Sequence, residues 1–212
     1  SDVYASSQQD AFLMRIDQFG GVIWSKVIDE EYVEHYNAIV DVGDGFIVGG
    51  RRWINFDSRN LLTKFDYDGN LIWEKYPGDT ATLAYDNLIR DLAVVSDGIM
   101  VGTSGFDEIS GTTNAILMKL DFDGNVIWEK KFGSDSTETR IDYLEKVQTN
   151  DNGFYLKMIS QNQTWDLFYY WIKVDENGNE VWRKNLKLYL PTTVDYDSLL
   201  YFKDVTVYDQ NN

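Results

Sequence analysis

Three oxygen-bearing side chains spaced two residues apart are the first candidate for chemistry. Asp66, Asp68 and Asn70 stand as at the start of a calcium-binding EF-hand loop. That loop needs a glycine at its sixth position and a bidentate glutamate at its twelfth. Here Gly69 occupies the fourth position and Pro77 the twelfth. We therefore expect a structural turn, and the sequence predicts no metal site and no cofactor.

Residues for nucleophilic or acid–base catalysis are scarce. His35 is the only histidine, and it lies in the polar segment EEYVEHYN, for which we expect a solvated loop. No serine stands in a Gly-x-Ser-x-Gly context, and no glycine-rich segment carries the Lys-Ser/Thr of a phosphate-binding loop. A glycosidase needs two facing carboxylates, and among 35 acidic residues the sequence singles out no pair. We predict no catalytic residue.

Aromatic and charged residues in the segments 49–60, 103–114 and 160–171 are the candidates for ligand binding. Each segment lies between two predicted strands at an equivalent place, so we expect all three on one side of the fold. Exposed rings there can form a platform for a sugar or a protein, or can cover the edge of the fold. The predicted contact residues are Arg51, Arg52, Trp53, Phe56, Phe106, Asp107 and Trp165. Adjacent residues such as Arg51 and Arg52 point to opposite faces of a strand.

The elements that must position these residues repeat along the chain. The tryptophans of the repeated phrase, Trp24, Trp73, Trp128 and Trp182, lie 49, 55 and 54 residues apart. Each follows an apolar strand and an acidic turn, as in NAILMKLDFDGNVIW, and a second hairpin with an Asp-Gly or Asn-Gly turn follows three of them. Four short strands in about 50 residues are typical of one β-propeller blade.

We therefore predict one all-β domain over residues 1–212, a β-propeller of about four four-stranded blades. The units run approximately over 10–59, 60–113, 114–164 and 165–212, the last completed by 1–9. In this interpretation the strand near residue 4 closes the ring and removes its free edges. The alternative is that the chain is a fragment of a larger propeller.

The repeated phrase has a local role in this prediction. Asp68 and Asp123 are expected to hydrogen-bond the backbone across the turn, and the glycines that follow them take positive φ. In Ile72–Trp73 and Ile127–Trp128, one side chain is expected to pack within the blade and the other against its neighbour.

The phrases TKFDYDGNLIW and MKLDFDGNVIW, with the strand GFIVGG, resemble repeats of bacterial secreted and lipoprotein-type β-propellers, grouped with the PQQ-like, or quinoprotein-dehydrogenase-like, superfamily. The resemblance covers essentially the whole chain. It implies a non-catalytic module that is extracellular or on the bacterial cell surface. The phrase also partly resembles the Asp box of sialidase-type propellers, with Asp68 and Trp73 at its spacing, and in that family the box is a structural hairpin.

Composition limits the partners. The net charge of −16 repels phosphate backbones and anionic membrane surfaces, so we expect neither nucleic acid nor membrane insertion. The absence of cysteine excludes disulfides and thiolate metal sites. We therefore expect a binding module for a protein or a carbohydrate; a structural segment of a larger propeller is the alternative, and an enzyme dependent on PQQ or acting on sugars is the least favoured interpretation.

Overall fold

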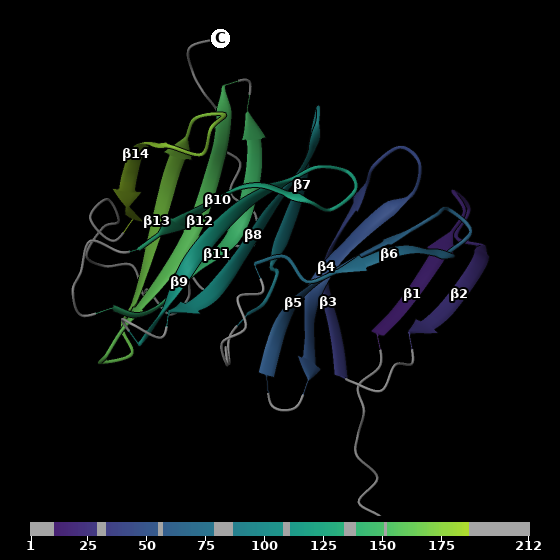
Figure 1. Ribbon diagram of the computed structural model, residues 1–212, viewed down its shortest axis with the longest axis horizontal. Coiled ribbons are helices and arrows are strands. Elements are labelled where there is room, and N and C mark those ends of the chain that lie inside the picture. Colours follow the sequence, from purple (N-terminus) through teal and green to yellow (C-terminus); the bar gives the residue numbers. More distant parts are fainter. Residues whose placement is uncertain are drawn as a thin grey trace, which may run out of the picture.

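The computed structural model describes residues 11–28, 33–54, 57–78, 87–107, 111–133, 139–150 and 152–186. The elements in those ranges are strands, which confirms the all-β class (Figure 1). In chain order they are β1 (Ala11–Ile16), β2 (Val22–Ile28), β3 (Val33–Asp41), β4 (Phe46–Ile54), β5 (Asp57–Phe65), β6 (Leu71–Lys75), β7 (Asp91–Val95), β8 (Gly98–Asp107), β9 (Thr112–Leu120), β10 (Val126–Phe132), β11 (Thr139–Asn150), β12 (Gly153–Asn162), β13 (Leu167–Val174) and β14 (Glu180–Asn185). Among these residues, no helix is long and apolar enough to cross a bilayer.

The strands form antiparallel sets in chain order. β1 and β2 form a hairpin sheet, and β3-β4-β5-β6 form a four-stranded sheet. The sets β7–β10 and β11–β14 have the same order, but one parallel pairing, Ile141 with Thr113, joins them into a single eight-stranded sheet. The first strands of successive sets, β3, β7 and β11, contact one another along the molecule.

These sets are offset by two strands from the units read in the sequence. The unit 10–59 contains β1 to β4, yet β1–β2 and β3–β4 lie in different sheets. The antiparallel ladder between β4 and β5 runs without a break from Phe46–Phe65 to Ile54–Asp57, across the boundary between two units. Each four-stranded set therefore combines the second hairpin of one unit with the first hairpin of the next.

The acidic turns are Asx turns held by their first aspartate. Asp66 Oδ1 accepts hydrogen bonds from the backbone N–H of Asp68 at 2.9 Å and of Asn70 at 2.8 Å, and the Asn70 side chain donates to Asp66 Oδ2. Asp121 and Asp175 hold their turns in the same way. The expectation that Asp68 and Asp123 carry these bonds is wrong, because an Asx side chain reaches forward to N–H groups two and four residues later.

The glycines of these turns receive the tryptophan of the preceding repeat. Gly69, Gly124 and Gly178 have φ values of 78°, 77° and 76°, which confirms the predicted positive φ at the first two. A Cβ added at these positions would lie 3.1 Å from Trp24, 2.9 Å from Trp73 and 2.6 Å from Trp128, in each case from Cη2. The repeated phrase is needed in each hairpin for two contacts. Its tryptophan ring packs on the acidic turn of the next hairpin, and its own turn glycine leaves room for the tryptophan ring of the previous hairpin.

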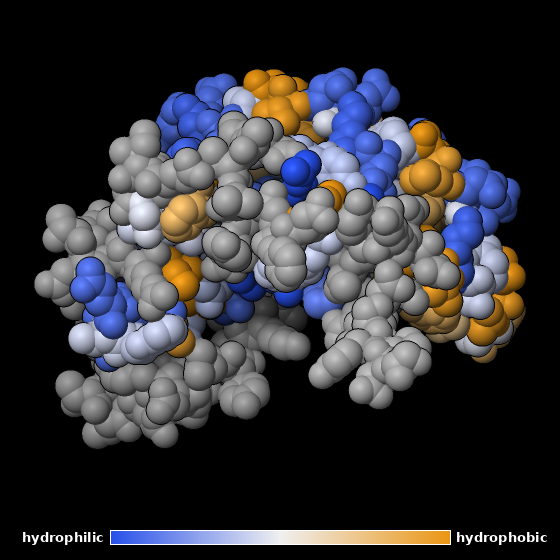
Figure 2. Space-filling view, turned by 60° about the horizontal axis from the view of Figure 1, so that its bottom comes forward, coloured by the Kyte–Doolittle hydropathy of each residue, from blue (hydrophilic) through white to orange (hydrophobic). Residues whose placement is uncertain are grey.

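Only the tryptophan of each Ile-Trp pair packs against a neighbour. Ile72 and Ile127 are exposed, so the expectation that both side chains of each pair are packed, one within its blade and one against the neighbour, is wrong for the isoleucines. Leu71 and Val126 of the same strands are exposed as well, and Figure 2 shows separate apolar groups (orange) on the surface. The core lies between successive sets instead, where cluster residues such as Ile47 and Met118, or Leu117 and Leu156, come from neighbouring sets.

The described strands form an open series, with β1–β2 at one end and β13–β14 at the other (Figure 1). The strand near residue 4 that was predicted to close a ring, and the last predicted strand at 198–212, lie outside the described residues. His35 lies within β3, so the expected loop there is wrong; its neighbours Tyr36 and Ile39 belong to the same paired strand.

Candidate ligand-binding surface

The three predicted loop segments occupy equivalent hairpins. β4–β5, β8–β9 and β12–β13 each join the second and third strands of a four-stranded set. Near their ends Trp53 pairs with Ser58, Phe106 with Thr113, and Gln161 with Leu167. Much of each segment is therefore strand rather than loop. Residues at the tips are held on rigid ladders, as a binding site requires.

Trp165 lies at the tip of β12–β13, a turn held by side-chain hydrogen bonds. Asn162 Oδ1 accepts hydrogen bonds from the N–H of Thr164 at 3.0 Å and of Asp166 at 2.8 Å, and Thr164 Oγ1 donates to Asp166 Oδ2 at 2.7 Å. This is the same turn as Asp66–Asn70, with Trp165 in place of the glycine. Trp165 has a φ of 69°, the one positive value found among described residues other than glycine, and its side chain is 63% exposed.

A bulky residue in the left-handed region costs on the order of 1 kcal/mol or more. The side chain is 63% exposed, so burial offsets little of this cost. Backbone strain of this kind concentrates at functional sites. Trp165 is therefore the strongest candidate for a contact residue in the described part of the chain.

Arg51, Trp53 and His35 form a second cluster at the β3–β4 ladder. The Arg51 guanidinium carbon lies 5.0 Å from the centre of the Trp53 ring, within cation–π range. Arg51 Nη2 lies 3.5 Å from His35 Nδ1, and the two residues pair directly across the strands. Burial, and then the charge of Arg51, lower the pKa of His35, so the imidazole is neutral at physiological pH. The three half-buried side chains lie on the same face of β3 and β4 and carry one fixed positive charge.

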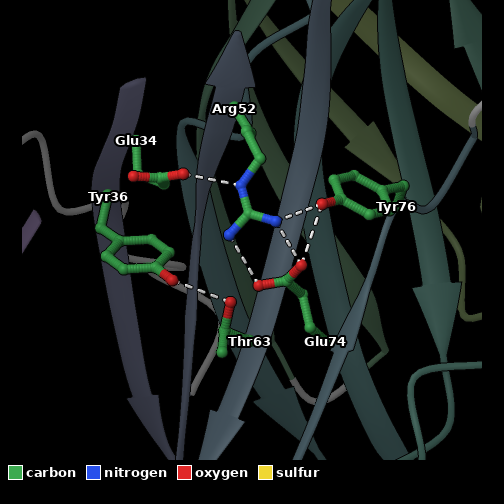
Figure 3. A network of polar contacts seen from close by, with 6 residues as sticks. All are labelled: Glu34, Tyr36, Arg52, Thr63, Glu74 and Tyr76. Atoms are coloured by element: carbon green, nitrogen blue, oxygen red, sulfur yellow. Dashed lines mark hydrogen bonds and ion pairs between the residues drawn. The ribbon is translucent and has the colours of Figure 1, made fainter. Parts of the chain in front are cut away.

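Arg52 points to the opposite face, as alternation along a strand predicts, and is buried there (Figure 3). Its Nε donates to Glu34 Oε1 at 2.8 Å, and its two terminal nitrogens donate to the Glu74 carboxylate at 2.5 and 2.9 Å. It also donates to the hydroxyl of Tyr76. Its side chain is committed to β3 and β6, so the structure places Arg52 in the interior rather than at the predicted binding surface.

The same buried network shifts the pKa values of two tyrosines. Burial raises the pKa of Tyr36, whose hydroxyl is 2.9 Å from Thr63 Oγ1, to about 12. Burial and the hydrogen bond to Glu74 raise the pKa of Tyr76 to about 12. Burial opposes the charge of Arg52, but the hydrogen bond and charge of Glu74 outweigh it and hold the Arg52 pKa above its ordinary value. The network links β3, β4 and β6 through buried ion pairs and hydrogen bonds.

The remaining predicted contact residues are placed unequally. Phe106 is half-buried near the end of β8. Asp107 ends that strand, but its side chain lies outside the described residues, as does all of Phe56. The structure thus brings Arg51 and Trp53 together with His35, which the sequence had not indicated as a contact residue, and puts Trp165 on the hairpin of another set.

No group of three or more metal-ligating side chains occurs in the described ranges. The oxygens of Asp66 accept hydrogen bonds within their own turn, and the Asn70 side-chain bond is the first cause that lowers the Asp66 pKa. The described residues thus present aromatic and cationic side chains near the ends of these hairpins. No protein-family model matches the chain, and no curated protein matches it significantly.

Proposed function

We propose that the chain is a β-propeller repeat segment that acts as a non-catalytic binding module for a carbohydrate or a protein, outside the cell or on its surface. The observation that carries the binding proposal is the exposed Trp165 ring, held at positive φ on a hydrogen-bonded turn. The surface location is an expectation from the family resemblance alone.

The propeller proposal is supported by the order of the strands. Each four-stranded set runs antiparallel in chain order, and the first strands of successive sets are neighbours, as they are around a propeller axis. The ring-to-glycine contact repeats at each step between hairpins. The number of blades is part of this proposal; the described strands themselves form an open series.

The binding proposal is supported by the chemistry of the side chains. A tryptophan face stacks on the C–H face of a sugar ring or fills a pocket of a protein partner, and tryptophan and arginine are the residues that most often dominate such interfaces. Arg51 beside Trp53 adds hydrogen-bond donors that suit hydroxyl or carboxylate groups. The ligand contacts are therefore assigned to Arg51, Trp53 and Trp165.

A thermal-shift screen of the chain against a panel of soluble oligosaccharides tests this proposal, followed by calorimetric titration of each hit. Trp165→Gly removes the ring and fits the backbone, so it should weaken binding by about 10- to 100-fold while the protein stays folded. Phe19→Ala is the matched control, because Phe19 is an exposed ring on the Asp17–Gly21 turn of another hairpin. A ligand that binds Trp165→Gly as well as the unaltered protein would contradict the assignment.

A further inference from the structure

Successive hairpins interlock through one repeated contact. Besides the ring over the glycine, the lysine two residues after each tryptophan reaches the same turn: Lys26 donates to the Gly69 carbonyl, Lys75 to Asn125 Oδ1 at 2.7 Å, and Lys130 to Asn179 Oδ1 at 3.3 Å. The contact thus has two complementary parts, a Trp-x-Lys strand and a glycine turn, and it occurs three times within the chain.

Among the described residues, each part of this contact occurs once without the other. The turn Asp17–Gly21 has the same geometry, with Gly20 at a φ of 84°, but a Cβ added there would meet nothing within 4 Å. Gly20 is exposed, whereas Gly69, Gly124 and Gly178 are buried under a ring. At the other end of the series, Trp182 in β14 is 37% exposed and has its ring 6.0 Å from the Tyr155 ring of its own set, but it covers no turn glycine among the described residues. Its partner across the hairpin is Lys173, as Lys64 and Lys119 are for Trp73 and Trp128.

An apolar face beside the unmatched turn is also uncovered. Phe12, Met14 and Ile16 of β1 are 60%, 51% and 54% exposed. The residues at the same places in the other three hairpins are at most 7% exposed; they are Leu61, Thr63, Phe65, Ile116, Met118, Leu120, Tyr170, Ile172 and Val174. The space-filling view shows apolar side chains gathered at the end of the molecule that β1 and β2 form, on the right (Figure 2).

The chain itself shows what covers this face. Ile116, Met118 and Leu120 pack against Ile47 and Leu62 of the preceding set. Tyr170, Ile172 and Val174 pack against the preceding set in the same way, through residues such as Met100 and Leu117. By analogy, the cover for the β1 face is a set that ends in a Trp-x-Lys strand, as β11–β14 does. In β11–β14 the residues equivalent to Ile47 and Leu62 are Tyr155 and Trp171, which are buried, so the accessible part of this set is its edge at Trp182.

We propose that the Phe12–Met14–Ile16 face and the Asp17–Gly21 turn of one molecule bind the Trp182 edge of a second copy, head to tail. The contact would reproduce the ring-over-glycine part of the internal one, with the second copy's Trp182 over Gly20. The interface is heterologous, so one molecule can bind a partner at each end. This proposal uses other residues than ligand binding at Trp165 and stands independently of it.

Sedimentation of the unaltered chain over a wide range of concentrations tests the proposal, at an ionic strength of about 0.15 M so that repulsion between the acidic molecules is screened. The expected result is association that increases with concentration. Met14→Asp and Trp182→Ala should each weaken association by more than about tenfold, because each removes an apolar anchor. Ile23→Asp is the matched control: Ile23 is 54% exposed, but its equivalents Ile72 and Ile127 are exposed too, so association should not change.

Mixing two variants separates head-to-tail binding from other modes. Met14→Asp retains an intact Trp182 edge, and Trp182→Ala retains an intact β1 face. Their equimolar mixture should form a one-to-one dimer and nothing larger, although neither variant associates alone. A mixture that stays monomeric while the unaltered chain associates would overturn the head-to-tail mode. An unaltered chain that is monomeric at every concentration would overturn the proposal outright, whether the face stays open or is covered by the same chain.

Discussion

Replacing the turn glycines by alanine, one at a time, measures how tightly successive hairpins interlock. The four positions have nearly equal φ values, 84° at Gly20, 78° at Gly69, 77° at Gly124 and 76° at Gly178. An alanine in this region costs about 1–2 kcal/mol, and this backbone cost is the same at all four. What differs is the space available for a Cβ. A Cβ at Gly20 would have no atom within 4 Å, whereas a Cβ at Gly178 would lie 2.6 Å from Trp128 Cη2.

That difference sets the expected magnitudes. Forcing a methyl group into a packed contact costs about 1–3 kcal/mol beyond the backbone term. Gly178→Ala should therefore lower the free energy of unfolding by about 2–5 kcal/mol, and Gly20→Ala by only about 1–2 kcal/mol. Gly124→Ala and Gly69→Ala should fall between them in that order, because their distances to the ring are 2.9 and 3.1 Å.

Urea unfolding at low protein concentration, where no second copy covers Gly20, gives these free energies. A background that carries Trp128→Leu should reduce the excess loss at Gly178 and leave the loss at Gly20 unchanged, because distant sites are additive. Equal losses at Gly20 and Gly178 would refute the interlocking contact and leave only a backbone role for these glycines.

Two further predictions concern the buried network around Arg52. Arg52→Leu should lower the free energy of unfolding in urea by about 3–5 kcal/mol, because Glu34 and Glu74 lose their counter-charge in the interior. Arg51→Leu, on the other face of the same strand, should lower it by less than about 1 kcal/mol. Similar losses for the two variants would show that the network does not stabilise the fold. Since the folded pKa values of Tyr36 and Tyr76 are raised to about 12 from 10, the folded state favours the neutral phenols, so their contribution to stability is complete below pH 10 and is lost as the pH rises to about 12. Ultraviolet titration should show at least two phenols that ionise late, with one fewer in Tyr76→Phe, and ionisation of all tyrosines near pH 10 would contradict this.

The strand order and the turns could be predicted from the sequence because they depend on local patterns. Asp-x-x-Gly-Asn turns and Asp-Gly dipeptides fix where the chain reverses, and alternation along β4 correctly separated Arg51 from Arg52. The strand at which each four-stranded set begins could not be predicted. The repeated sequence is equally consistent with sets that begin at the first hairpin of a unit and with sets that begin at its second hairpin. Only the hydrogen bonds between β4 and β5 decide between them.

The spacing of the repeated residues does not indicate which residues they contact. Nothing within the phrase says that Trp73 covers Gly124 rather than its own sheet, because the contact joins residues 51 positions apart. The burial of Arg52 depends on Glu34 and Glu74, from two other strands. The turn at Asn162 lacks the glycine that marks the others, so its pattern of Asn, Thr and Asp at the first, third and fifth positions was the signal that could have identified it.

The most direct test of the binding proposal is fluorine NMR of the chain labelled with 5-fluorotryptophan, recorded while a hit from the oligosaccharide panel is added. Trp165→Gly assigns one of the seven tryptophan signals. The account predicts that the Trp165 signal shifts on saturation, while the half-buried Trp24, Trp73 and Trp128 signals stay in place. Saturation that leaves the Trp165 signal unmoved would contradict it.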